Sequence, residues 1–196
     1  MAGATRLPFG RAGEEVILEG NIHRDNDLHG ANLAGMALAG VDLHGANLQA
    51  ADLTDAVLTR ANLSRANLAR ANLTRAHLGS SKLIRANLTG AILTRAELSG
   101  ATLTDANLTG ADVTRSYLTG ANLSRVKLCG ADLASSKLYD VNLTGADLTG
   151  ANLAGTSLEG ANLTDAKFFD ANFTGINLHE ALYRNTTMPD GSIRNG

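Results

Sequence analysis

The stretch "TRANLSRANLARANLTRAHLG" (Thr59–Gly79) repeats alanine and leucine with a period of five residues, and arginine closes four successive fives. A period of five matches neither the period of two of a β-strand nor the 3.6-residue period of an α-helix. In a helix, leucines five residues apart would be rotated by about 500° and would form no apolar stripe. In a strand, successive leucines would point to opposite faces, because five is odd. The period therefore predicts another architecture.

The same period runs through most of the chain. From Asn26 to Asn185, 160 of the 196 residues divide into thirty-two fives without an insertion. The third residue of a five is almost always leucine, and the first is usually alanine. Both side chains always point inward if each five is a short extended piece followed by a corner that turns by about 90°. Four fives then close one square coil, and coils stacked at about 4.8 Å form a rod about 38 Å long.

Units such as "ANLTG" (86–90), "ADLTG" (146–150) and "ANLSR" (61–65) resemble those of the pentapeptide-repeat family. The resemblance covers Asn26–Asn185 and implies an all-β fold, a right-handed quadrilateral parallel β-helix (solenoid) of about eight square coils. We expect residues twenty apart to stack directly. One inward column is then a core ladder formed by Leu33, Leu53, Leu73, Leu93, Val113, Leu133, Leu153 and Phe173.

The remaining positions of a five suit the outside of such a coil. Asparagine, common at the second position, can form hydrogen-bonded ladders between stacked coils. Threonine at the fourth position suits an exposed extended backbone. Glycine at the fifth position suits a corner with positive φ, as in a type II turn. Corners that end in arginine or aspartate, such as Arg65 and Asp105, should adopt another turn geometry or accept strain.

The sequence predicts three segments. Residues 1–15 form an N-terminal flexible or capping segment, residues 16–185 form the β-helix (regular from residue 26), and residues 186–196 form a C-terminal cap or tail. The fives extend weakly back through "VILEG" (Val16–Gly20), and the next five would point His23 into the core. We expect either a buried, hydrogen-bonded histidine or a local break in the repeat there, rather than a functional histidine.

At the C-terminal end, we expect Pro189–Gly191 to form a turn. The apolar residues of this region would then fold over the last coil as a cap; they are Leu182, Tyr183, Met188 and Ile193. The alternative is a homodimer through the C-terminal end, which the family resemblance implies because some members associate in this way.

Composition excludes several classes of protein. The net charge of −2 and the pI of about 6.2 argue against a general nucleic-acid binder, which would be strongly basic. No run of about 18 apolar residues occurs, so we expect no membrane span. The N-terminus does not read as a secretory signal, and the single cysteine, Cys129, cannot form an internal disulfide. We therefore expect a cytoplasmic protein; the alternative is a lumenal or periplasmic protein whose targeting peptide has been removed.

The sequence offers no arrangement of residues for catalysis. No two of the five histidines stand twenty residues apart, so no metal-binding ladder forms. Cys129 falls at an outward fourth position without an activating partner. A rod without loop insertions also provides no cleft for a substrate. We predict a protein that is not an enzyme, with no catalytic residue, no metal and no cofactor.

Two outward columns gather residues that favour contact with other molecules. Arg75, Arg95 and Arg115 form a candidate anion-binding column at one corner. Because like charges repel, these side chains must splay apart, pair with carboxylates such as Asp112, or bind an anion. The corner opposite this arginine column contains Arg65, Arg85, Asp105 and Arg125, whose mixed charges predict a salt-bridge ladder. A second outward column stacks Tyr117 on Lys137.

Tyr117, Lys137 and the nearby Tyr139 are a candidate interaction patch, because tyrosine and lysine side chains together are prone to contacts. The alternative is a local packing pair without a partner.

Three functions remain. A rigid core and free sides favour a structural or protein-interaction module whose partner the sequence does not identify. The resemblance implies a second function, because some bacterial members mimic DNA and modulate type II topoisomerases, inhibiting gyrase or protecting it from quinolones. The small net charge and the absence of acidic residues between Ala56 and Arg95 depart from that pattern. The third function is contact with an anion or nucleic acid through a belt of arginines, Arg60, Arg65, Arg70 and Arg75.

Overall fold

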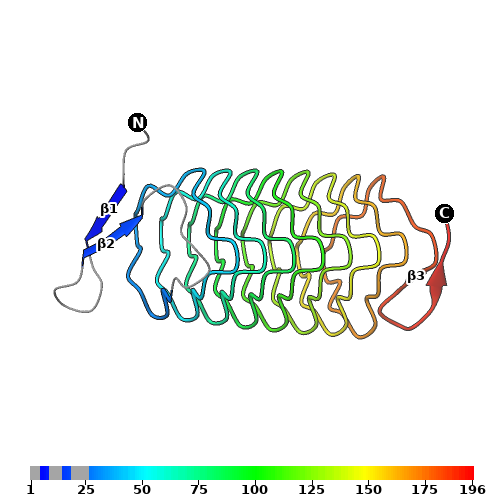
Figure 1. Cartoon of the computed structure of the whole chain (residues 1–196). Helices are drawn as coiled ribbons and strands as arrows, with labels where there is room; N and C mark the ends of the chain where they lie inside the picture. Colours follow the sequence, from blue (N-terminus) through cyan, green and yellow to red (C-terminus); the bar gives the residue numbers. More distant parts are fainter. Residues whose placement is uncertain (1–4, 9–14, 19–26) are drawn as a thin grey trace.

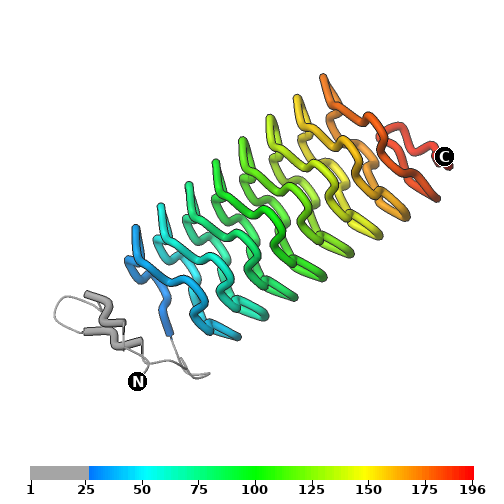
Figure 2. Tube along the Cα trace, turned by 90° about the horizontal axis from the view of Figure 1, so that it is seen from above, coloured from blue at the N-terminus to red at the C-terminus, as the bar shows by residue number. Residues whose placement is uncertain are grey.

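The computed structural model describes residues 5–8, 15–18 and 27–196. From Asp27 onward the chain winds as a right-handed quadrilateral β-helix, whose coils stack into a rod (Figure 1). Parallel bridges join residues twenty apart, from the pair Asp27–Asn47 to the pair Lys167–Thr187. Figure 2 shows the same regular stack from above. The predicted fold and the coil of twenty residues are therefore confirmed.

The rod has four faces, which we name after their second-position columns. Face A carries the column from Asn32 to Asn172, and face B carries that from Ala37 to Asn177. Face C carries the column from Asp42 to Leu182, and face D carries that from Asp27 to Thr187. The chain passes through faces A, B, C and D in this order, and the fifth residue of each five turns the corner to the next face.

First-position and third-position side chains fill the core. From the second coil to the seventh, leucines and alanines at these positions are almost completely buried. The column from Leu33 to Leu153 is at most 1% exposed, whereas Phe173, on the last coil, is only partly buried. Phe173 makes an edge-to-face contact with Phe168, with the ring centroids 5.1 Å apart. At its C-terminal end the core therefore contains aromatic rings at third positions in place of leucine.

Hydrogen bonds between coils satisfy most of the backbone. The N–H of Leu93 donates to Asp112 of the next coil (2.6 Å), and the N–H of Asp112 donates back to Ala91 (2.9 Å). The fifth-position N–H of Arg95 also donates to the next coil (2.9 Å), and the first-position N–H of Ala96 closes the turn onto Leu93 (2.8 Å). In this five, the fourth-position N–H, that of Thr94, has no backbone acceptor among the described residues. Because a buried donor needs an acceptor, this N–H explains why asparagine or aspartate is common at the second position.

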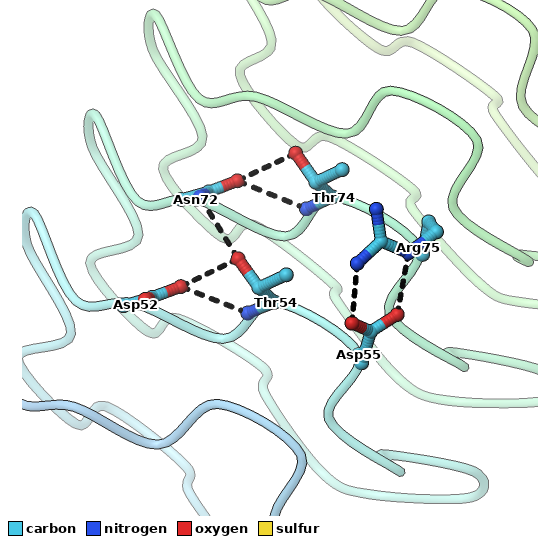
Figure 3. A network of polar contacts seen from close by, with 6 residues as sticks. All are labelled: Asp52, Thr54, Asp55, Asn72, Thr74 and Arg75. Atoms are coloured by element: carbon cyan, nitrogen blue, oxygen red, sulfur yellow. Dashed lines mark hydrogen bonds and ion pairs between the residues drawn. The ribbon is translucent and has the colours of Figure 1, made fainter.

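Asparagine or aspartate at the second position caps the fourth-position N–H. The N–H groups of Thr54 and Thr74 donate to Asp52 and Asn72 at 3.0 and 3.1 Å, and each threonine hydroxyl donates to the same oxygen at 2.6 Å (Figure 3). These are Asx turns. The fourth residue therefore lies in the turn, and the prediction of an extended backbone at this position is wrong.

The predicted asparagine ladder is confirmed. For example, the Nδ2 group of Asn87 donates to the Oδ1 atom of Asn67 at 3.1 Å, twenty residues earlier. One second-position amide thus makes two hydrogen bonds: its oxygen accepts from the N–H of its own turn, and its nitrogen donates to the neighbouring coil.

Corners adopt the left-handed conformation whatever residue they carry. Arg65 and Asp105 both have a φ of 59°, close to the 63° of Gly90. The alternative of a different turn geometry is therefore wrong, and these corners accept the strain. Eight successive corners, from Ala50 to Arg85, carry no glycine and have φ values of 55–59°. A Cβ atom makes this conformation costly, so strain is concentrated in the second and third coils.

Near the N-terminus, strand β1 (Thr5–Pro8) pairs antiparallel with strand β2 (Glu15–Leu18), with Thr5 opposite Leu18. Val16–Leu18, which the sequence assigns to an early five, lie in this hairpin strand, and the parallel bridges between described residues begin at Asp27. His23 lies outside the described residues. The boundaries of the three predicted segments stay a prediction.

At the C-terminus, strand β3 (Thr186–Thr187) pairs antiparallel with strand β4 (Ile193–Arg194). The predicted turn forms at Pro189–Asp190, and Gly191 follows with a φ of 82°. Tyr183 is buried under the Arg194 guanidinium, which lies 3.8 Å from the ring centroid, and Met188 packs against the core. Leu182 and Ile193 are exposed instead. Two of the four predicted capping residues therefore cover the last coil.

Buried hydroxyl groups at first positions give a test of the packing. The Ser81 hydroxyl is buried without a hydrogen-bond partner, whereas the Thr156 hydroxyl donates to the carbonyl of Leu133 at 2.7 Å. We expect Ser81→Ala to raise the free energy of unfolding by about 1 kcal/mol, because it removes an unpartnered polar group. Thr156→Val should lower it by about 1 kcal/mol. Urea denaturation measures both, and equal losses in the two variants would contradict the assignment.

Candidate interaction surfaces

The candidate anion-binding column is partly neutralised. The Arg75 guanidinium forms a two-pronged ion pair with Asp55, with its Nε 2.7 Å from Oδ1 (Figure 3). This hydrogen-bonded pair lowers the pKa of Asp55 and raises that of Arg75. Arg95 and Arg115 pair with no carboxylate among the described residues. The column therefore contains two free cations, and its role in anion binding stays a prediction.

Asp112 does not pair with the arginine column as the sequence suggested. Its Oδ1 atom accepts the N–H and the hydroxyl of Thr114 at 2.9 and 2.7 Å, and its Oδ2 atom accepts the hydroxyl of Thr94 at 2.9 Å. Partial burial raises the pKa of Asp112, but the hydrogen bonds from both threonines outweigh this effect and hold the pKa below its ordinary value of 3.8.

This lowered pKa predicts a loss of stability in acid. A carboxyl group whose pKa is depressed by folding stabilises the protein fully above its ordinary pKa, and that stabilisation is lost as the pH falls through the folded-state value. We expect Asp112→Asn, which keeps the Oδ1 acceptor, to lose less stability than the wild type between neutral pH and about pH 3. Urea midpoints measured across that range would test this, and parallel curves for the two proteins would contradict it.

The opposite corner forms the salt-bridge ladder that the sequence predicts. Arg125 pairs with Asp105 at 2.7 Å, and Arg85 lies 3.9 Å from the same carboxylate on the other side. The hydrogen bond from Arg125 holds the pKa of Asp105 below its usual range. Arg65, one coil further, has no carboxylate partner among the described residues.

The candidate interaction patch lies on face B. The Lys137 Nζ atom lies 3.2 Å from the Tyr139 hydroxyl and 5.5 Å from the centroid of its ring, which fits a cation–π contact. Tyr117 is bridged to Lys137 through the backbone and leaves 48% of its surface exposed. The structure thus brings the three residues together, and their role as a binding patch stays a prediction.

Face B differs from the other faces in its capping. From Ala37 to Ser157 no second-position residue of this face is asparagine or aspartate, and Glu97 alone reaches a fourth-position N–H, that of Ser99 at 3.1 Å. The N–H groups of Thr59, Gly79, Thr119 and Tyr139 have no acceptor among the described residues. The signal was present in the sequence, because every fourth five loses its Asn or Asp, but it becomes visible only once the capping bond is known.

A second surface escaped the sequence analysis. On face C, Lys82 is bridged to Asn62, and the Arg65 N–H donates to the carbonyl of Ile84 at 2.9 Å. The four cationic side chains around these two coils form the cationic cluster; they are Arg60, Arg65, Lys82 and Arg85. Arg65 and Arg85 share one corner column, but Arg60 and Lys82 lie in two other columns, so the column pattern alone does not bring the four residues together.

Metal-binding groups do not appear in the described part of the chain. Cys129 is half-buried, and burial raises the pKa of its thiol, which disfavours the thiolate form. The described residues contain no group of three or more histidine, cysteine, aspartate or glutamate side chains placed to hold a metal ion. They also contain no helix long and apolar enough to cross a membrane.

Several solved structures share this architecture. HetL, a pentapeptide repeat protein involved in heterocyst differentiation regulation from the cyanobacterium Nostoc sp. strain PCC 7120, is 33% identical, with 87% of this chain and 88% of HetL covered and a TM-score of 0.51. A trypsin-treated form of QnrB1, a plasmid-mediated fluoroquinolone resistance protein, is 20% identical, with 89% of both chains covered and a TM-score of 0.62. The likeness to QnrB1 shows the fold alone. No curated protein sequence matches the chain.

The family model for pentapeptide repeats matches eight times. The copies overlap and together span residues 26–182. Because these matches cover most of the sequence, and because each five has the core, cap and corner described above, the chain belongs to the pentapeptide-repeat family.

Proposed function

We propose that this protein is a rigid, non-enzymatic protein-binding module whose main contact surface is face B. The observation that carries the proposal is the loss of capping residues along this face. Except at Glu97, which caps the N–H of Ser99, each lost Asn or Asp leaves a turn N–H without an acceptor among the described residues, which the fold alone gives no reason to do. The positions carry varied side chains instead, among them His77, Glu97, Tyr117 and Lys137.

The rod suits this role because its contact surface is fixed before binding. The backbone between coils is hydrogen-bonded throughout the stack, so little conformational freedom is lost when a partner binds. Exposed tyrosine next to lysine is typical of protein contact surfaces. The similarity to HetL, which is involved in the regulation of differentiation, supports a regulatory binding role rather than a catalytic one.

Affinity capture from an extract of the native host tests the proposal. The tagged wild type should retain a specific protein that the double variant Tyr117→Asn/Lys137→Asn does not retain. Both substitutions introduce the usual second-position residue, so the fold should be preserved. The matched control, Ile92→Asn/Lys127→Asn, makes the same kind of change on faces A and D. Retention that is equal in all three proteins, or no retained protein, would contradict the proposal.

A second candidate is modulation of a type II topoisomerase by imitation of DNA. The fold shared with QnrB1 supports it. The acidic C-terminal half supports it as well, because the sequence between Leu128 and Tyr183 contains seven carboxylates and only two lysines. The cationic middle of the rod opposes it, because duplex DNA carries a negative charge about every 1.7 Å. A gyrase supercoiling assay with and without the purified protein decides, and unchanged supercoiling rules this candidate out.

The C-terminal end also supports a homodimer. Phe169, Leu182 and Ile193 leave 54–56% of their surface exposed there, and Phe173 and Leu178 are only partly buried. Such an apolar end favours association with a second copy. Sedimentation velocity should show a dimer that Leu182→Asp converts to a monomer, whereas Ile92→Asp, an equal change on the side of the rod, should leave it intact. A wild-type monomer at all concentrations would contradict the proposal.

A further inference from the structure

The cationic cluster (Arg60, Arg65, Lys82 and Arg85) occupies one side of the rod. Arg60 and Arg65 stand at the two corners that flank face C in one coil. Lys82 and Arg85 lie on the next coil, because Lys82 is bridged to Asn62 and the Arg65 N–H donates to Ile84. Stacked coils are about 4.8 Å apart, so the four charges gather within two adjacent coils.

No carboxylate among the described residues neutralises Arg60, Arg65 or Lys82. Arg85 reaches Asp105 only at 3.9 Å, and Asp105 is already held by Arg125 at 2.7 Å. Asp42, on the preceding coil of face C, accepts from the N–H of His44 and from the Nδ2 group of Asn62. The cluster is therefore a local excess of positive charge with acidic residues at both ends along the rod.

The three arginines of the cluster occupy strained corners. Arg60, Arg65 and Arg85 have φ values of 59°, 59° and 57°, in the left-handed region that glycine adopts more easily. Ion pairing explains the arginine at the equivalent corner residue Arg75, but it does not explain Arg60 or Arg65. Strain that no contact within the fold offsets is a reason to look for function.

The cluster also contains a turn without its cap. Lys82 stands at a second position, so the N–H of Ile84 lacks the side-chain oxygen that caps this group in fives with Asn or Asp there, and it has no acceptor among the described residues. On face A the same group donates to a carboxylate oxygen: Thr114 to Asp112 and Ala134 to Asp132, both at 2.9 Å. A carboxylate is thus the acceptor that this N–H meets in fives with Asp at the second position.

We propose that the cationic cluster binds an acidic segment of a partner protein. One carboxylate of the segment accepts a hydrogen bond from the free N–H of Ile84, where an Asn or Asp oxygen would otherwise lie. The neighbouring carboxylates of the segment pair with the four cationic side chains of the cluster. The half-buried Ile84 side chain offers an apolar contact next to these charges, as protein interfaces commonly combine.

A nucleic acid fits the cluster less well than an acidic peptide does. A phosphate backbone lying along the rod would pass over Asp42 on one side and Asp105 on the other, and like charges would repel it. The inference rests on the proposed function, because the acidic segment belongs to the protein partner, but it concerns face C rather than face B.

Fluorescence anisotropy tests the inference with a labelled peptide that alternates glutamate and leucine. The wild type should bind this peptide in a salt-dependent manner and should not bind the version with glutamine in place of glutamate. The cluster variant, Arg60→Gly/Arg65→Gly/Lys82→Asn/Arg85→Gly, should bind it at least about tenfold more weakly. Glycine relieves the strained corners and asparagine restores the cap, so this variant should fold and should unfold at a higher temperature.

The control is Lys127→Asn/Lys167→Asn/Arg184→Gln. It removes three positive charges that lie outside the cluster, outside the arginine column and outside face B, so it should keep the wild-type affinity for the acidic peptide. Equal losses in both variants, or no peptide binding by the wild type, would overturn the inference. Tighter binding of duplex DNA than of the peptide at the cluster would overturn the choice of a protein segment. Capture of a host partner through face B without peptide binding would refute this inference alone.

Discussion

Leu93→Ala is expected to lower the free energy of unfolding by about 2–5 kcal/mol. Leu93 is completely buried in the middle of the rod, between Leu73 and Val113 of its ladder. The hydrogen bonds between coils hold the walls around it in place, so the cavity left by the lost methyl groups cannot close. Urea denaturation followed by circular dichroism measures the loss.

The matched control for this substitution is Leu178→Ala, at a third position of the last coil. Leu178 is only partly buried, and no further coil of the repeat lies beyond it. We expect a loss of about 1 kcal/mol, because a partly exposed side chain leaves a smaller cavity. Equal losses at the two positions would show that burial within the stack does not set the stability of a coil.

The triple variant Arg60→Gly/Arg65→Gly/Arg70→Gly is expected to raise the free energy of unfolding by about 2–3 kcal/mol. Each corner has a φ of 58–59°, where a Cβ atom costs about 1–2 kcal/mol and glycine recovers most of that cost. None of the three arginines pairs with a carboxylate among the described residues. The change in the urea midpoint measures the gain.

Arg75→Gly is the control for the corner effect, because it removes the same strain together with the ion pair to Asp55. We expect a smaller gain for it than for Arg60→Gly alone. A triple variant no more stable than the wild type would show that the left-handed corners are not strained. Should stability rise while binding of the acidic peptide falls, the arginines of the cluster would serve function at the expense of the fold.

The fold could be predicted from the sequence because every five repeats the same local chemistry. A leucine at each third position and an alanine at each first position leave one arrangement that buries both, and the structure has that arrangement. The backbone of the turn could not be predicted in the same way. Arg65 disfavours positive φ on its own, and the hydrogen bonds to neighbouring coils impose it nevertheless.

The candidate sites could be predicted only where stacking alone decides contact. The spacing of twenty residues correctly brought Arg85, Asp105 and Arg125 together. It could not show that Asp112 is unavailable to the arginine column, because that depends on the hydrogen bonds by which Thr114 already occupies this carboxylate. The free N–H of Ile84 could not be predicted either. Its missing acceptor can be recognised only once the capping hydrogen bond of the other turns is known, and no column of residues reveals it.

Because each corner turns the chain by about 90°, the number of fives between two residues decides whether they lie on the same face of the rod. Removing one whole coil, such as residues 91–110, would shorten the rod and leave every downstream side chain on its own face. Removing a single five would preserve the core pattern equally well, yet it would rotate everything that follows by about 90°. Tyr117 and Lys137 would then leave the side that carries Val57 and His77 and point from face A. Members of this family can therefore lengthen or shorten freely only in steps of one coil, if surfaces assembled from distant repeats are to stay aligned.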